Sequence, residues 1–408
     1  MKKRDVVILF MVFSFLFYIG CASSPRVEGA KIDIRDGRYE RADSLLRAEI
    51  KENPNNAEAY FYLGEVSVQL RDYKEAAKAY AKAIELDTNY LKKIKKDENM
   101  KYRVWVGFQY GGQQYIVEGK VDSAIIFIKK AIEIDPEKEA SYALLGRVYV
   151  EKEDYEKAED VVKKLLKVKK ISPEAEFILG RVQFSKKEYE NAIERFKKAA
   201  ELFAQELKNM KENLKTQINL DDKKIKGILE KTKGVELKEM ENILEKEGIA
   251  KNKIKGMTQW IIRYRAKEKE LANALFWEGR TYHPLKKYEE GDSILARAIE
   301  IDPTNIDALY DRGYGLHVLG KHEEAVKLLD KVIESGIYKD DYFLYLVAGA
   351  SYLNLKEYEK AEEFLLKAKE IAPDNPEVYQ KLAILYRDKG DNETAAKYFE
   401  IYKEKSKK

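Results

Sequence analysis

The chain of 408 residues is poor in the side chains that most often carry metal binding and redox chemistry, since it has one cysteine, Cys21, and three histidines. A single cysteine allows no disulfide within the chain. Two of the histidines, His317 and His322, stand five residues apart across an expected turn. That spacing suits chelation on one helical face poorly, and no carboxylate cluster or second cysteine accompanies the pair. The sequence therefore indicates no metal site.

Signals for enzyme chemistry are missing as well. Strand patterns are absent, so no glycine-rich phosphate loop follows a strand. No serine or cysteine stands at a recognisable catalytic spacing from a histidine. Basic and acidic side chains nearly balance, at 76 against 72, and the formal net charge of +4 gives no strong field for nucleic acid. We therefore expect no enzyme, no cofactor and no nucleic-acid partner.

Amphipathic helix is what the chain has in abundance. In residues 139–170 the large apolar side chains Tyr142, Leu145 and Val148 recur at steps of three residues around Gly146. A polar break follows, and from Tyr155 onward the same periodicity returns. Such spacing places apolar side chains on one face of each of two helices. The pair forms a hairpin that needs neighbours to bury its apolar face.

Small residues return along the chain with a period near 34 residues, and they mark the neighbours. These packing positions are Gly64, Gly112, Gly146, Gly180, Gly279, Gly313, Gly349 and Ala383. An alanine or glycine stands twelve residues after each of them. Because small residues allow two helix backbones to approach closely, their periodic return marks where the helices of each hairpin pack.

With two helices in each period, the chain resembles the tetratricopeptide repeat family. The resemblance implies an all-α fold, a right-handed superhelical solenoid of about eight helical hairpins with a helical insert between the fifth and the sixth. We expect an N-terminal array over residues 36–203, with an insertion near 89–101, and a C-terminal array over 271–408. The first unit is expected to be partial, because residues 31–35 contain no convincing partner helix.

The expected insert, residues 204–270, carries 17 basic and 12 acidic side chains. A protruding basic hairpin of this kind suits anionic lipid or an acidic partner, whereas the alternative is a solvated helical spacer. Within the N-terminal array, Gly111 and Gly112 stand inside an expected helix, where glycine is unfavourable. We interpret them as a site of close packing, with a local hinge as the alternative.

The N-terminus has a different character. Basic residues precede an apolar run from Val6 to Ile19, which is too short to span a bilayer comfortably and matches the core of a secretory signal. Cys21 follows directly, an arrangement that resembles a bacterial lipoprotein signal. The resemblance implies a signal peptide over residues 1–20, acylation of Cys21, a tether over 21–35 and attachment to the cell envelope. In a didermic bacterium the site would be the outer membrane, facing the periplasm. An uncleaved signal anchor and a cleaved signal with a free thiol are the alternatives.

A second pattern lies on the first helix of each hairpin. Residues three before, one after and four after the packing glycine share one face, which in the family lines a concave groove. Arginine recurs there as Arg147, Arg181 and Arg280. The same face carries the aromatic and histidine side chains Phe177, Phe184, Phe276, His283, Tyr310, Tyr314 and His317.

Arginine pairs with carboxylates and stacks on rings, so this face predicts binding of a peptide with acidic groups or a free C-terminus. The alternative is that each arginine pairs with a nearby glutamate and that the rings fill gaps between hairpins. Two classes of function remain. One is a membrane-anchored scaffold for protein–protein interaction in envelope assembly, secretion or pilus-type machinery, as the family resemblance implies. The other is a periplasmic receptor for a peptide or cell-wall fragment, or an enzyme regulator.

Overall fold

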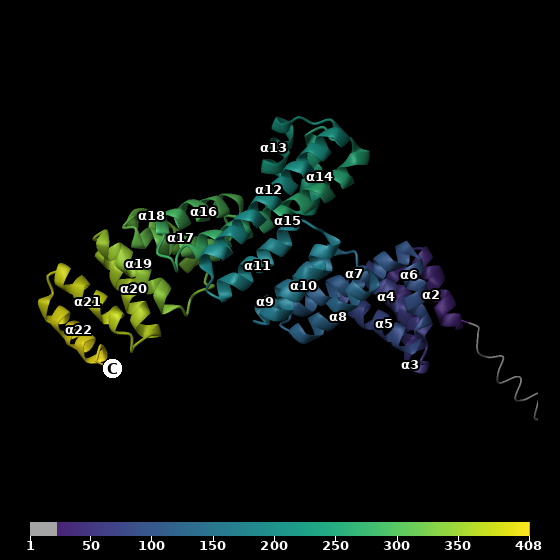
Figure 1. Ribbon diagram of the computed structural model, residues 1–408, viewed down its shortest axis with the longest axis horizontal. Coiled ribbons are helices and arrows are strands. Elements are labelled where there is room, and N and C mark those ends of the chain that lie inside the picture. The colour runs from purple at the N-terminus through teal and green to yellow at the C-terminus, as the bar shows by residue number, and fades with distance from the viewer. Residues whose placement is uncertain (1–22, 408) are drawn as a thin grey trace, which may run out of the picture. The chain divides into compact units, whose positions relative to one another are not determined.

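The computed structural model describes residues 23–407, and over that range it contains helices and no β-strand. The predicted signal sequence and Cys21 lie outside the described residues. Contacts divide the described residues into two compact units, 23–170 and 171–407. Each unit is built of antiparallel helical hairpins that follow one another in chain order (Figure 1). Among the described residues, no helix combines the length and apolar character that a membrane crossing requires.

The first unit contains four hairpins and one short additional helix. The hairpins are α2 (Pro25–Arg35) with α3 (Tyr39–Glu52), α4 (Ala57–Gln69) with α5 (Tyr73–Leu86), α7 (Glu98–Val117) with α8 (Val121–Ile134), and α9 (Glu139–Glu151) with α10 (Tyr155–Val168). The additional helix, α6 (Asn89–Lys96), coincides with the insertion predicted near residues 89–101.

The first hairpin is complete, which corrects the expectation of a partial first unit preceded by a tether over residues 21–35. Helix α2 begins at Pro25, and the hydroxyl of Ser24 caps it by accepting a hydrogen bond of 3.2 Å from the backbone N–H of Val27. Val27 and Ala30 are fully buried in the same core as the side chains of α3. With so few buried apolar positions, α2 lacks the strong periodicity that reveals its neighbours.

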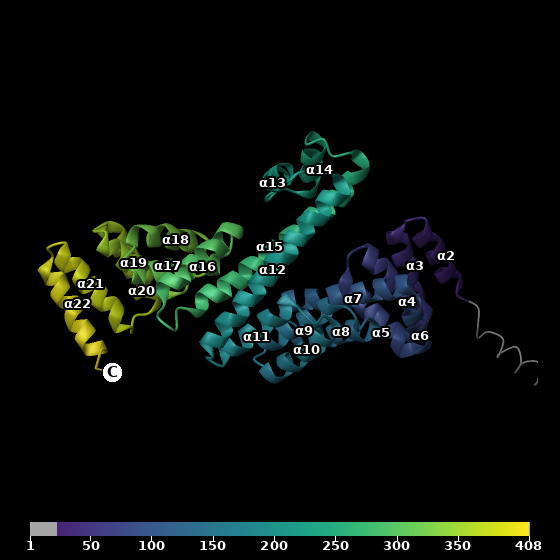
Figure 2. The same ribbon diagram turned by 45° about the horizontal axis from the view of Figure 1, so that its top comes forward.

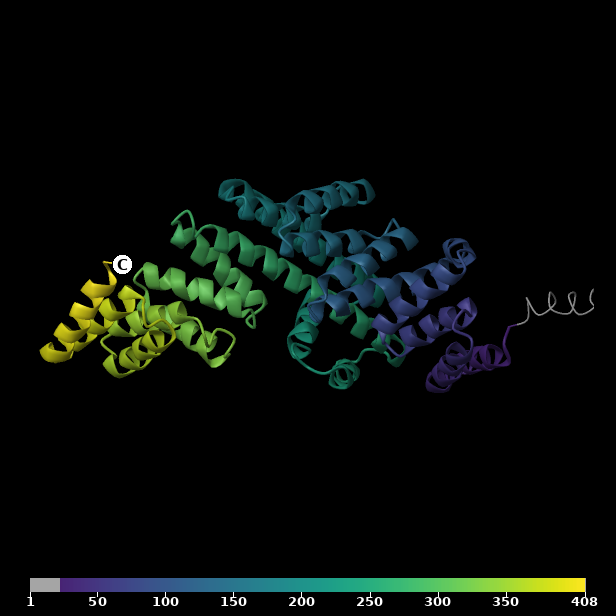
Figure 3. The same cartoon turned by 90° about the horizontal axis from the view of Figure 1, so that it is seen from below.

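The second unit continues the pattern with five hairpins. These are α11 (Pro173–Ser185) with α12 (Tyr189–Ile218), α15 (Lys251–Thr281) with α16 (Tyr288–Ile301), α17 (Ile306–Val318) with α18 (His322–Glu334), α19 (Tyr342–Asn354) with α20 (Tyr358–Ile371), and α21 (Pro376–Asp388) with α22 (Asn392–Lys405). Seen from below, the green to yellow helices of the last four hairpins succeed one another along the chain (Figure 3).

The predicted insert consists of the extended ends of α12 and α15 together with α13 (Asp222–Lys231) and α14 (Leu237–Lys246). The long helices α12 and α15 run side by side, and α13 and α14 lie at their far end (Figure 2). The four helices enclose a core of their own, in which Ile228, Leu244 and Ile261 are fully buried. The insert is therefore a small helical subdomain with its own packing.

The hairpins also share a turn. Seven residues after each packing position, the described chain has a residue with a positive φ between 58° and 85°, a conformation typical of helix C-termini. These residues are Arg71, Gly119, Glu153, Lys187, Lys286, Gly320, Lys356 and Gly390, and Gly37 has the same conformation in the turn of the first hairpin. A left-handed residue at this point reverses the chain so that the second helix packs back on the first.

Glycine at the packing positions allows close contact between helices. A Cβ on Gly111 would lie 2.6 Å from the backbone oxygen of Tyr73, and one on Gly112 would lie 2.7 Å from the side chain of Ile128. Both glycines are buried inside the continuous helix α7. The interpretation of this pair as a site of close packing is confirmed.

Candidate functional site

The predicted groove face of the second unit contains a cluster around Trp277, on α15. The guanidinium carbon of Arg181, on α11, lies 3.9 Å from the centre of the Trp277 ring, and that of Arg280 lies 5.3 Å from it. Both distances are within the range of a favourable cation–π contact. We call these three residues the Arg–Trp cluster. The insert of residues 204–270 separates the two arginines in sequence, yet one indole brings them together.

Neighbouring rings hold Trp277 in place. Phe184 meets it edge-on at 5.3 Å between ring centres, Phe276 does so at 5.6 Å, and Phe196 lies at 6.0 Å. Edge-to-face arrangements of this kind are the preferred geometry of aromatic pairs. The indole is therefore a rigid support, and its position fixes the orientation of the guanidinium groups that lie against it.

Arg280 has an acidic neighbour on the next hairpin. Its Nε atom lies 3.4 Å from Oδ2 of Asp311, but that buried oxygen accepts no well-aligned hydrogen bond from any described residue. Burial raises the pKa of Asp311 to about 6, although the Arg280 charge opposes the rise. The Arg280 side chain keeps 40% of its surface exposed. Arg280 is thus only loosely held and still presents positive charge to the solvent.

The tyrosines and histidines of this face contact one another or nearby polar groups. Tyr310 donates a hydrogen bond of 2.8 Å to Asp341, and Nδ1 of His317 lies 2.7 Å from the hydroxyl of Ser351. The ring of Tyr314 lies edge-on to that of His283 at 5.8 Å. Burial lowers the pKa of His283 and of His317 to about 4. Both histidines are therefore neutral near pH 7, and the positive charge of this face comes from arginine.

Other predicted site residues have different surroundings. Phe177 and Phe276 are only 6% and 3% exposed and belong to the core between hairpins, so their side chains serve packing. Arg147 lies on α9 in the first unit, where it is exposed and forms no ion pair or hydrogen bond with any described residue. Cys21 precedes the described part of the chain. Within residues 23–407, no group of three or more histidine, cysteine or acidic side chains is placed to hold a metal ion.

Trp277 was absent from the sequence prediction, although it organises the site. It stands two residues before the packing glycine Gly279, whereas the predicted groove positions were three before, one after and four after it. A large side chain two residues before the packing glycine reaches the arginine that follows the packing glycine of the preceding hairpin, here Arg181. This position could have been included in the prediction. A tryptophan beside two arginines of equivalent register is therefore informative in a helical-hairpin array.

Comparison with known proteins gives several similarities. Anaphase-promoting complex subunit 6 of Arabidopsis thaliana is 26% identical over 131 residues, which are 32% of this chain and 24% of that protein. The chain thus spans about a quarter of the length of this curated relative. Among solved structures, PilF of Pseudomonas aeruginosa matches 69% of this chain and 97% of its own at 13% identity and a TM-score of 0.48. YrrB, described as a TPR protein with an unusual peptide-binding site, matches 62% of this chain and 96% of its own at 18% identity and a TM-score of 0.38.

Family profiles give the broader result. One tetratricopeptide repeat profile matches residues 28–90 and 144–206, and a second matches residues 272–305, 344–375 and 376–400. Together these segments cover more than half of the chain, and their first and last boundaries lie in the first and last hairpins of the structure. Repeated hairpins with small packing residues, a common left-handed turn and these profile matches lead to one conclusion: the chain belongs to the tetratricopeptide repeat family.

Proposed function

We propose that this protein is a non-enzymatic interaction scaffold, held at a bacterial membrane through a lipid on Cys21, that binds an acidic peptide segment of a partner protein on the Arg–Trp cluster. Tetratricopeptide repeats generally bind proteins or peptides. The observation that carries the proposal is the pair of guanidinium groups of Arg181 and Arg280 on the single ring of Trp277.

The chemistry of the cluster favours carboxylates. Guanidinium groups present the planar pair of donors that matches the two oxygens of a carboxylate, and contact with the Trp277 ring orients them. The neutral state of the nearby histidines leaves arginine as the source of positive charge, and Arg280 is exposed enough to meet a ligand. An extended peptide with acidic side chains or a free C-terminus is therefore the best match.

The proposed location rests on residues 1–21 of the sequence. The basic start, the short apolar run and the cysteine that follows it suit export and acylation. In that setting the two arrays would face the periplasm and recruit partners of envelope assembly, secretion or pilus-type machinery.

The peptide site can be tested with labelled acidic peptides and their amide-containing counterparts, in which glutamine and asparagine replace the acids. The double change Arg181→Glu and Arg280→Glu should weaken binding of the acidic peptides by about tenfold or more, because two attractive charges become repulsive. Trp277→Leu should weaken it as well, since the arginines lose their support. Raised salt should reduce affinity for the acidic peptides only.

A matched control is the double change Lys327→Glu and Lys331→Glu on α18, two exposed lysines outside the predicted groove face. It alters the net charge by the same amount and should leave peptide affinity nearly unchanged. Arg147→Glu tests separately whether the first unit contributes. In-cell crosslinking then identifies the partner. If the crosslinked partners survive the arginine double change but are lost on deletion of residues 221–256, the insert and not the Arg–Trp cluster is the binding element.

A further inference from the structure

A second candidate site lies in the same unit and shares no residue with the Arg–Trp cluster. A cavity of about 460 Å³ opens between α12, α15 and α16. Its walls are mostly apolar and include Leu275 and Ile294, and Glu278 of α15 contributes to the lining. A volume of this size is typical of sites for small ligands.

The Glu278 carboxyl is the unusual feature of this cavity. The residue is only 4% exposed, yet it forms no hydrogen bond or ion pair within the described chain. Burial raises its pKa to about 7, against the opposing charges of Arg297 and Lys197. The carboxyl lines an open cavity, where a cationic group of a ligand can replace solvent and supply a charge-assisted contact.

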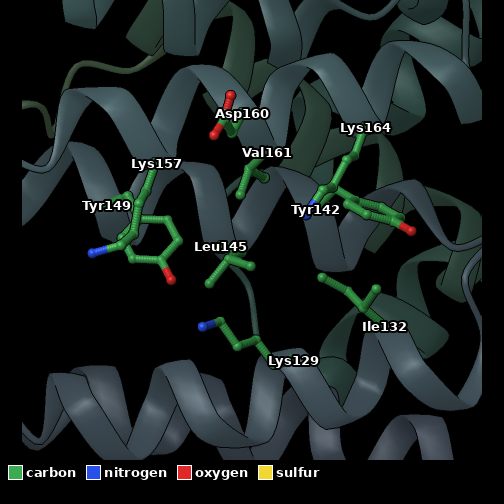
Figure 4. Close-up of a pocket in the computed structure, with 9 residues that line it drawn as sticks. All are labelled: Lys129, Ile132, Tyr142, Leu145, Tyr149, Lys157, Asp160, Val161 and Lys164. Carbon is green, nitrogen blue, oxygen red and sulfur yellow. The ribbon is translucent and has the colours of Figure 1, made fainter.

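The first unit provides an internal comparison at the same place in the repeat. Its cavity of about 300 Å³ lies between α8, α9 and α10, with Leu145 at the centre between Tyr142 and Tyr149 (Figure 4). Leu145 precedes the packing glycine of its hairpin, and Glu278 precedes that of its own. The repeat therefore places a leucine at this position in one cavity and a carboxyl in the other, so the fold by itself does not require an acid there.

Both cavities have a basic side chain on each flanking second helix. These are Lys129 and Lys164 in the first unit, and Lys197 and Arg297 in the second. All four are free of ion pairs with described residues. In the first two hairpins, the equivalent residues of the second helices are Arg47 on α3 and Lys82 on α5. Each of these two cations forms ion pairs with acidic side chains. Both cavities are thus flanked by cations without an ion pair, whereas the equivalent cations of the first two hairpins are paired.

Four charged groups surround the second cavity: Lys197 and Glu201 of α12, Glu278 of α15 and Arg297 of α16. Together they sum to zero when both acids are ionised. A cation alone would be repelled by the two basic groups, and an anion alone would leave Glu278 without a partner. An apolar molecule would satisfy neither. A short molecule with one charge of each sign and an aliphatic body satisfies all of them.

We propose that this cavity binds a short zwitterion, with the amino group of the ligand on the Glu278 carboxylate and the carboxylate of the ligand between Lys197 and Arg297. The aliphatic part lies against Leu275 and Ile294. A free amino acid and a short peptide both carry this chemistry. The site is independent of peptide capture at the Arg–Trp cluster.

Calorimetric titration of the full-length protein near pH 7 tests the proposal. The probes are 5-aminopentanoate, which has both charges, pentanoate, which lacks the amine, and pentylamine, which lacks the carboxylate. We expect 5-aminopentanoate to bind at least about tenfold more tightly than either of the others, since each end forms a charge-assisted contact. Leucine and leucylleucine, titrated in the same way, distinguish a free amino acid from a short peptide as the natural source.

Proton release supplies a second readout. The empty Glu278 carboxyl is partly protonated near pH 7, and an incoming ammonium group should ionise it, so the binding enthalpy should differ between buffers of different ionisation enthalpy. Glu278→Leu, which reproduces the leucine of the first unit, should abolish both the binding and the proton release while the helical circular dichroism stays unchanged. Lys129→Ala, in the other cavity, is the matched control and should change neither.

Two results would overturn the assignment. One is an absence of binding by 5-aminopentanoate, leucine and leucylleucine at millimolar concentration. The other is equal affinity in the unchanged protein and in the folded Glu278→Leu variant. The Arg181 and Arg280 variants test acidic-peptide binding at the Arg–Trp cluster and not binding in the Glu278 cavity. The two proposals can therefore fail separately.

Discussion

Three consecutive residues of α15 have three different roles. Trp277 supports the arginines of the predicted groove, Glu278 lines the cavity against α12 and α16, and Gly279 packs against Leu295 of α16. Successive residues of a helix point in directions about 100° apart, so neighbours in sequence reach different surroundings. A single helix can therefore serve a groove, a cavity and a helix–helix contact at once.

Glu278 should make stability depend on pH in a defined direction. Its pKa is about 7 in the folded chain and near 4.5 when exposed, so the folded state holds its proton more tightly. The contribution of Glu278 to the free energy of unfolding is therefore greatest below pH 4.5, and it is lost as the pH rises through 7. Between pH 4.5 and 8, this effect lowers the free energy of unfolding by an amount on the order of 3 kcal/mol, and Glu278→Leu should abolish that decrease. Urea unfolding of both proteins at the two pH values measures it, and equal pH dependence would contradict the assignment.

Gly111 should tolerate no side chain. A methyl group there would meet the backbone oxygen of Tyr73 at 2.6 Å and Cβ of Ala77 at 2.7 Å, neither of which can rotate away. Gly111→Ala should destabilise the protein by about 1–3 kcal/mol. Gly227, inside α13, has open space around its added Cβ, so Gly227→Ala should be neutral or stabilise by about 0.5–1 kcal/mol. Denaturant titration of both variants checks the contrast, and similar effects would refute the packing role.

At the scale of elements, the common turn is the device that makes a hairpin from two helices. Several hairpins place lysine, arginine or glutamate in the left-handed conformation that glycine adopts without strain. These side chains keep the same geometry because the packing of the two helices imposes it. The turn is thus a tertiary consequence where it lacks glycine.

The turn residues should respond in opposite ways to substitution. Lys356 is exposed and has a φ of 61°, and Gly320, at the same place in the preceding hairpin, has a φ of 74°. Lys356→Gly should stabilise the protein by about 1 kcal/mol because it relieves the left-handed conformation, whereas Gly320→Ala should destabilise it by about 1 kcal/mol. Thermal unfolding followed by circular dichroism tests the signs. The same sign for both would contradict the shared turn.

The insert should unfold as a unit of its own when its core is damaged. Leu244 is fully buried among side chains of the four insert helices. Leu244→Ala should weaken that core by about 2–5 kcal/mol. Hydrogen exchange should then accelerate in α13 and α14 but remain slow in α17 to α22. Accelerated exchange throughout the unit would show that the insert and the hairpins form one cooperative core.

At the scale of the whole molecule, the proposed lipid anchor at Cys21 is open to a direct test. If Cys21 is acylated as proposed, Cys21→Ser should leave the protein soluble or unprocessed, because no thiol remains to take the lipid. Membrane fractionation and the mass of the mature protein measure this. Unchanged membrane association of the serine variant would contradict the lipid anchor.

Much of the architecture could be predicted from the sequence because it depends on local periodicity. Small residues at the packing positions and apolar residues at helical spacing predicted the hairpins and the helical insert between the fifth and sixth predicted units. The weakly periodic helix α2 was not predicted, because its few apolar residues are recognisable as core only once α3 packs on them. In the same way, Gly227 and Gly256 lie inside α13 and α15, although glycine is unfavourable within a helix.

The same distinction between local spacing and tertiary packing applies to the candidate sites. Sequence alone determined the family, the order of the hairpins and the register that places Arg181 and Arg280 at equivalent positions, because these follow from spacing along one chain. Only the tertiary structure decided that both arginines lie on Trp277, that Phe177 and Phe276 are buried, and that Glu278 lines a cavity without a partner. Such contacts join helices distant in sequence, and their energies depend on burial, which spacing does not encode.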